Sequence, residues 1–180
     1  MATNTYMTLT DRNGALVVGE GSVAHLTDVY DKPVPPASAL ALPDYSFDLA
    51  QQTGTGSAPG TGAGAGKITL DPLSITRPVD VVSPQLFTAC ATGTAFQQLN
   101  LIFVKSGTGS ALAGFLQFTF KAVMVQTISW SHDDESPRES VTFAYGGLQI
   151  RYRQQSSSGS LGKPVVAGWD GVRNVPDTTP

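Results

Sequence analysis

A glycine-rich run that ends in a lysine is the part of this sequence closest to a chemical motif. The stretch TGAGAGKIT, at Thr61–Thr69, resembles a phosphate-binding loop, whose backbone N–H groups and lysine hold nucleotide phosphates. Such a loop requires a glycine where Thr61 stands and a serine or threonine where Ile68 follows Lys67. It must also open a helix, whereas Ile68 begins a strand-like segment. We therefore expect a loop here and no nucleotide site.

A second candidate brings metal-ligand residue types together in the run His132–Glu135, which reads HDDE. Imidazole and carboxylate groups both bind divalent cations. Adjacent residues of a hairpin point in different directions, however, and the matching ligands would have to come from elsewhere in the chain. We expect a solvated hairpin loop, and we expect His25, which has no recognisable partner, to be an ordinary side chain.

Residue types that act as nucleophiles in enzymes are present but are not arranged for catalysis. The sequence holds no G-x-S-x-G run, the pattern around the nucleophilic serine of one large hydrolase class. Cys90 is the only cysteine, so no intrachain disulfide can form, and its apolar surroundings predict a core side chain. Trp130 and Trp169 lack the neighbouring aromatic and carboxylate residues of a sugar site, which favours packing. The sequence predicts a non-enzyme without metal or cofactor.

Length and charge narrow the function classes further. A chain of 180 residues with 41% hydrophobic residues is expected to form one soluble domain, residues 1–180, with its own core. The net charge of −3 and the lack of a basic stripe argue against nucleic acid as a partner. Apolar runs are too short for membrane insertion, and Met1–Thr5 lacks the features of a secretory signal.

One short helix, at about residues 83–92, is delimited by its flanking residues. Ser83 is expected to cap it, Pro84 suits the first helical position, and Gly93 suits the left-handed residue that ends a helix. Its apolar face is made of Leu86, Ala89 and Cys90, with Phe87 beside them. A helix this short is not stable alone, so it is expected to lie on a sheet.

Most of the remaining chain alternates between polar and apolar residues, as half-buried strands do. Strands are predicted at Thr5–Thr10, at Tyr45–Ala50 and in three longer segments, 68–75, 116–125 and 141–152. In the 116–125 segment one face is expected to carry Leu116, Phe118, Phe120, Ala122 and Met124, and Val123 and Val125 make the other face apolar as well. The alternation slips at Asp71-Pro72 and at Gly146-Gly147, which predicts β-bulges or sheet edges there.

Two segments lack the residues that could pack against the domain. Residues 154–163 (QQSSSGSLGK) are expected to form a flexible spacer before a small apolar segment that docks on the domain. Residues 53–66 hold neither a large side chain nor a charge, so they are predicted to form a long glycine-rich arm without a partner in their own domain. The arm comprises Thr53, Gly54, Thr55, Gly56, Ser57, Ala58, Pro59, Gly60, Thr61, Gly62, Ala63, Gly64, Ala65 and Gly66. The predicted fold class is mainly β: a small β-barrel of two packed antiparallel sheets with one short flanking helix.

Several segments, taken in order, resemble the haemolysin-coregulated protein (Hcp) family, whose members form the tube of the bacterial type VI secretion system. The likeness rests on GKITLDPLSITRPVD, VSPQLFTACATG and AFQQLNLIFVKSG, which lie between Gly66 and Gly107. It extends to PRESVTFAYGGLQIRYR at Pro137–Arg153 and to GWDGVRN at Gly168–Asn174, and more loosely to Thr5–Gly14. The segment between Gly14 and Pro43 is longer and richer in proline and alanine than the family pattern.

The resemblance implies a structural role. Six copies would form a ring with an open centre, rings would stack into a tube, and the tube would work with sheath, spike and effector proteins, sheltering effectors in its lumen. The protein would be made in the bacterial cytoplasm and exported by the type VI route without a signal peptide. The arm at residues 53–66 would contact a neighbouring subunit or ring. A closed ring would also pair the sheet edges that each subunit exposes.

Three other interpretations remain open at this point. A tail-tube subunit of another contractile particle would share the physics of the ring. A monomeric β-barrel that binds sugar or peptide would stay single in solution. An effector with an enzymatic extension is disfavoured, because the residues after Arg153 are too few for a catalytic domain.

Overall fold

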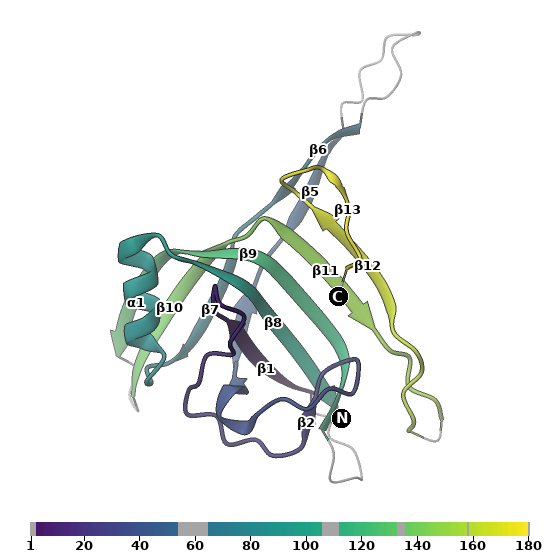
Figure 1. Ribbon diagram of the computed structural model, residues 1–180, viewed down its shortest axis with the longest axis horizontal. Helices are drawn as coiled ribbons and strands as arrows, with labels where there is room; N and C mark the ends of the chain where they lie inside the picture. Colours follow the sequence, from purple (N-terminus) through teal and green to yellow (C-terminus); the bar gives the residue numbers. More distant parts are fainter. Residues whose placement is uncertain (1–2, 54–64, 106–111, 133–135, 158, 180) are drawn as a thin grey trace, which may run out of the picture.

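The computed structural model describes residues 3–53, 65–105, 112–132, 136–157 and 159–179. Within these ranges the chain forms thirteen strands, one α-helix and one 3-10 helix, and eleven strands belong to one strongly curved sheet (Figure 1). The elements are β1 Thr3–Thr10, β2 Leu26–Thr27, η1 Pro36–Ser38, β3 Leu40–Ala41, β4 Asp44–Ser46, β5 Leu49–Thr53, β6 Ala65–Leu70, β7 Leu73–Pro78, α1 Ser83–Thr92, β8 Ala95–Lys105, β9 Leu112–His132, β10 Pro137–Ala144, β11 Gly147–Tyr152, β12 Val165–Asp170 and β13 Val175–Pro176.

Strand β9, which is 21 residues long, organises this sheet. β8 pairs with one edge of its first half, while β11 and then β10 run along the other edge. The sheet continues through β1 beyond β8, through β12 beyond β11, and through β7 and β4 beyond β10. Among the described residues, no hydrogen-bonded pairing joins β4 to β1 or β3, so the sheet curls around the core without closing. The predicted mainly β fold with one helix is confirmed, and the barrel is an open one.

The core lies inside this curve and is rich in aromatic side chains. Phe120 of β9 is fully buried and packs edge to face against Phe47 at 5.1 Å and Tyr145 at 4.8 Å between ring centroids. Phe103 of β8 and Tyr45 of β4 meet in the same way at 5.5 Å. These contacts join β4 and the segment after it to the opposite wall formed by β8 and β9, and they hold the open barrel together.

A sharp bend in β9 changes which residues face the core. Ala122 has φ of +52°, in the left-handed region that alanine rarely adopts, and Gly146 donates its N–H to the Lys121 carbonyl opposite this bend. The inward phase therefore shifts from Phe118 and Phe120 to Val123 and Val125, while Ala122 and Met124 are exposed. The prediction that Ala122 and Met124 share the face of Phe120 is wrong. The prediction of a bulge at Gly146-Gly147 is also wrong. Ala144 pairs with Met124 and Gly147 with Lys121, so both strands advance by three residues and no extra residue is inserted. The register irregularity lies instead between Thr142 and Phe143.

Helix α1 has the predicted bounds but a different N-terminal cap. Gly93 ends it at φ +67°, as predicted. Ser83 does not cap the helix: its hydroxyl accepts the Asp80 N–H at 3.1 Å and donates to Glu139 Oε1 at 2.9 Å. Glu139 is fully buried on β10, so this contact fixes the start of α1 to the sheet. The predicted cap is absent because the Ser83 hydroxyl binds Glu139, which lies 56 residues away in the sequence.

The Tyr145 hydroxyl is buried and has no hydrogen-bond partner among the described residues. Burial is the main cause that raises its pKa to about 12, with smaller contributions from Asp71 and Asp48. Because the folded-state pKa exceeds that of the unfolded chain, Tyr145 favours the folded state below about pH 10. This contribution is lost as the pH rises toward 12.

Tyr145→Phe is expected to leave stability at pH 7 within about 0.5 kcal/mol of wild type, because it removes a buried, unpaired hydroxyl and keeps the ring. The variant should also lose less stability than wild type between pH 9 and pH 12. Urea unfolding of both proteins across this range measures the difference. Parallel pH curves for the two proteins would contradict it, since all other titrating groups are shared.

Candidate assembly surfaces

The β5–β6 hairpin leaves the body of the molecule as a separate two-stranded sheet. Leu49 pairs with Leu70 near its base and Thr53 with Ala65 farther out, with an irregular register between Gln51 and Thr53. Figure 1 shows β5 and β6 extending away from the curved sheet. The structure thus begins the arm predicted at residues 53–66 as an antiparallel hairpin at Thr53, Ala65 and Gly66; residues 54–64 of that prediction lie outside the described residues.

An apolar hollow of about 300 Å³ lies between the base of this hairpin and the β9–β11–β12 part of the sheet. The hairpin contributes Leu49, Ile68 and Leu70, and the sheet contributes Phe118, Leu148, Ile150, Ala167, Gly168 and Trp169, with Phe47 beside them. Ile68, the residue that excluded a phosphate loop in the sequence, is thus an apolar lining residue on β6. Trp169 serves packing as predicted, with its indole N–H donated to Asn174 Oδ1 at 3.3 Å.

The opposite face of the same sheet region carries a buried polar network. Asn100 Oδ1 accepts hydrogen bonds from the Thr119 hydroxyl at 2.7 Å and the Gln117 amide at 3.0 Å, and the Asn100 amide donates to Thr8 at 3.1 Å. Arg151 donates to the Thr119 hydroxyl at 2.5 Å and to Gln149. The network joins β1, β8, β9 and β11 and gives partners to most of its polar groups, which would be costly to bury alone; Arg151 Nε has no partner among the described residues.

Two segments remote in sequence cover this polar face. Tyr30 lies over the guanidinium of Arg151 at 5.4 Å, and Asp31 binds Arg153 at 2.7 Å. The tail after β13 returns to β11 and β9, where Gln149 donates to the carbonyls of Asp177 and Thr179. Hydrogen bonds from the Thr179 N–H and then from Lys121 lower the pKa of Asp177 to about 2, so this carboxylate stays charged at neutral pH.

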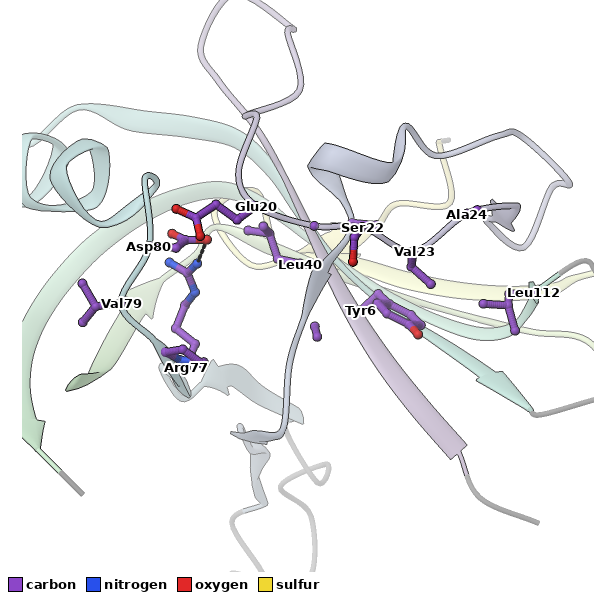
Figure 2. Close-up of a pocket in the computed structure, with 14 residues that line it drawn as sticks. Tyr6, Glu20, Ser22, Val23, Ala24, Leu40, Arg77, Val79, Asp80 and Leu112 are labelled. Carbon is purple, nitrogen blue, oxygen red and sulfur yellow. Dashed lines mark ion pairs between the residues drawn. The ribbon is translucent and has the colours of Figure 1, made fainter. Parts of the chain in front are cut away.

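A second, larger groove of about 710 Å³ opens where the sheet fails to close, between β3, the end of β7 and the segment Glu20–Ala24. Figure 2 shows its charged end, where Glu20 lies beside Asp80 and Arg77, and its apolar end at Tyr6, Val23 and Leu112. Arg77 Nη2 binds Asp80 at 2.5 Å and Nη1 binds Glu139 at 2.8 Å, so its charge is already neutralised within the chain. The groove gathers residues from five separate segments, and their spacing in the sequence does not predict it.

The other candidate residues are not brought together into a chemical site. Lys67 is exposed on β6 and His132 is exposed at the end of β9, while Asp133–Glu135 lie outside the described residues. Cys90 is half-buried and packs against the core from α1. Within the described ranges, no three His, Cys, Asp or Glu residues are close enough together to hold a metal ion. No helix in the described part of the chain has the length and apolar character to cross a membrane.

Comparison with known proteins identifies relatives of this arrangement. The family described as "Type VI secretion system effector, Hcp" matches residues 38–152. Protein hcp1 of Pseudomonas aeruginosa is 34% identical over 112 residues, which span 61% of this chain and 68% of that protein. A solved type six secretion system protein superposes with a TM-score of 0.75 at 22% identity, covering 98% of this chain and all of the other.

Two further solved structures share the fold at low identity. Hcp1 of Salmonella typhimurium superposes with a TM-score of 0.66 at 22% identity, over 98% of this chain and 100% of that one. A chain in the baseplate of an anti-feeding prophage superposes with a TM-score of 0.51 at 7% identity, over 83% of this chain and 93% of that one. At these identities the likeness concerns the fold, and the family match rests on sequence.

Proposed function

Because the chain belongs to the Hcp family, whose members are structural tube proteins of the type VI secretion system and not enzymes, we propose that its copies assemble into closed hexameric rings. The rings stack into a tube, and the whole chain, residues 1–180, acts as one building unit. The tube works with the sheath and spike proteins of the same system, and small effector proteins travel in its lumen. The protein is made in the bacterial cytoplasm and is exported with the tube by the type VI route.

The projecting β5–β6 hairpin is the observation that carries this proposal. A two-stranded hairpin is at best marginally stable in water when nothing packs against it. Here β5 and β6 pair only with each other among the described residues, and Leu49, which faces the apolar hollow, is exposed. A neighbouring copy would supply the missing contacts for this hairpin and for the arm at residues 53–66 that it begins.

A tube subunit of another contractile particle is the second candidate. The fold likeness to the chain in the six-fold symmetrised baseplate of an anti-feeding prophage favours it, because that chain belongs to a different particle. The ring contacts proposed here would be the same in both cases, and only the surrounding sheath and spike would differ.

Deleting Thr55–Ala65 is expected to leave the subunit folded and to raise the protein concentration needed for assembly at least tenfold. The deletion removes intermolecular contacts and leaves the core around Phe120 intact. Sizing chromatography and negative-stain electron microscopy of the purified protein measure it, with annular particles expected for wild type. A deletion of Ser156–Ser160, in the segment between β11 and β12, is the control and should assemble normally.

Unchanged rings and tubes in the Thr55–Ala65 deletion would contradict the role of the arm. Compact, solid wild-type particles at every concentration would contradict ring assembly itself and would favour the monomeric binding module.

A further inference from the structure

Strand β11 has its polar face buried and its apolar face exposed, the reverse of what a monomeric protein should show. On the polar face, Gln149 and Arg151 are each only 1% exposed. On the apolar face, Ile150 is 41% and Tyr152 is 44% exposed. Apolar side chains are stabilised by leaving water and charged ones are not, so this arrangement is unfavourable for an isolated subunit.

The apolar face continues across the neighbouring strands in register. Tyr152 is paired with Val165 of β12, which is 72% exposed, and Ile150 is paired with Ala167, which is also exposed. Opposite residues of paired strands share a face of the sheet. We call Ile150, Tyr152, Val165 and Ala167 the open sheet face. It borders the apolar hollow under the β5–β6 hairpin, to which Ile150 and Ala167 both belong.

The open sheet face continues the apolar face of β11 beyond the buried core. Leu148, one pair earlier on β11, is buried, and Phe120 opposite it on β9 is fully buried. Burial falls from this pair to Ile150 and then to Tyr152, while the polar face remains covered by Tyr30 and the tail at Asp177. The chain thus folds its own segments over the polar face and leaves the apolar one uncovered. An uncovered apolar surface of this kind marks a protein–protein contact.

A second exposed apolar surface lies on the opposite side of the molecule. Phe87 on α1 is 56% exposed and Trp130 on β9 is 54% exposed, with 6.4 Å between their ring centroids. We call these two residues the aromatic pair. Figure 1 shows α1 at one side of the curved sheet and β11 and β12 at the other. The two surfaces therefore point toward different neighbours.

We propose that the open sheet face and hollow of one copy receive the aromatic pair of the next copy in the ring. The inference rests on the proposed ring assembly and names its contact. A cyclic ring with one kind of contact needs two different, complementary surfaces on each subunit, and these are two exposed apolar surfaces of the same chain on different sides. A cavity of about 150 Å³ accommodates one benzene ring, so the hollow of about 300 Å³ has room for one ring of the aromatic pair, while the other packs on the open sheet face beside it.

The chemistry of the two surfaces suits the centre of such a contact. Aromatic anchors seated in apolar pockets dominate the binding energy of protein interfaces. A ring contact requires about 800 Å² from each partner, and the β5–β6 hairpin next to the hollow extends the contact area beyond the aromatic pair.

Val165→Lys tests this contact against Val18→Lys, which places the same charge on another exposed valine, between β1 and β2. Val165→Lys is expected to raise the protein concentration at half-assembly at least tenfold, measured by sedimentation velocity, because it places a lysine in the contact. Val18→Lys is expected to assemble like wild type. Equal assembly of both variants and wild type overturns the inference. A wild-type chain that never assembles overturns both the proposed ring assembly and the proposed contact. The two failures are therefore distinguished by whether the wild-type chain assembles.

Disulfide trapping tests the pairing of the two surfaces directly. The native cysteine is first replaced, as Cys90→Ala. Ala91→Cys, an exposed position one turn from Phe87 on α1, is then made on one batch, and Ala167→Cys, on the open sheet face, on another, so that both aromatic side chains are kept. Oxidation of the mixed batches is expected to link two chains efficiently, and each batch alone is expected to link poorly. Circular dichroism confirms that each variant is folded. Rings that form in the mixture without linkage across these positions overturn the inference even if ring assembly is correct.

Discussion

Arg77→Met is expected to lower the free energy of unfolding by about 3–5 kcal/mol. Glu139 is fully buried, and its Oε1 receives the Arg77 guanidinium at 2.8 Å and the Ser83 hydroxyl at 2.9 Å. Its Oε2 has no partner among the described residues. Removing the arginine leaves a charged carboxylate in the core with one hydroxyl as its partner. Chemical denaturation at pH 7 measures the loss.

The double variant Arg77→Met/Glu139→Met is the matched control. Since it removes both charges, most of the lost stability should return, although Asp80 also loses its partner at 2.5 Å. A double variant no more stable than Arg77→Met would show that the cost comes from packing. A single variant within about 1 kcal/mol of wild type would contradict the role of the ion pair.

Phe120→Ala is the second change with a large expected effect, about 3–5 kcal/mol of stability. Phe120 is fully buried, contacts Phe47 and Tyr145, and lies on β9 at the centre of the open barrel. The barrel is not closed by hydrogen bonds between β3 and β4, so the aromatic contacts across the core hold its walls together. Thermal unfolding should show a fall in Tm by several degrees per kcal/mol.

Phe87→Ala is the matched control for this change, because it removes the same side chain from an exposed site. Its effect on the stability of the dissociated subunit should stay within about 0.5 kcal/mol. If both variants lost equal stability, Phe120 would not be the centre of the core. Loss of assembly in Phe87→Ala with retained stability would agree with the contact proposed for the aromatic pair.

Local sequence signals predicted the elements well where they depend on near neighbours. The pattern around Pro84 and Gly93 predicted α1 with its correct bounds, and alternation predicted the long strands. The bend at Ala122 was missed, because alanine carries no signal for a left-handed conformation and the bend depends on Gly146 in the partner strand. The role of Ser83 as a helix cap was predicted wrongly because its partner in the fold, Glu139, is distant in the sequence.

The order of residues along the chain was enough to predict a mainly β fold with one short helix and a glycine-rich segment, and its motifs pointed to the Hcp family. Periodicity divides a strand such as β11 into two faces, with Ile150 and Tyr152 on one and Gln149 and Arg151 on the other. Which of the two faces is covered depends on the folded chain, because the covering groups, Tyr30 and Asp177, come from segments far away in the sequence. Burial is a property of long-range contacts, and alternation carries no information about them.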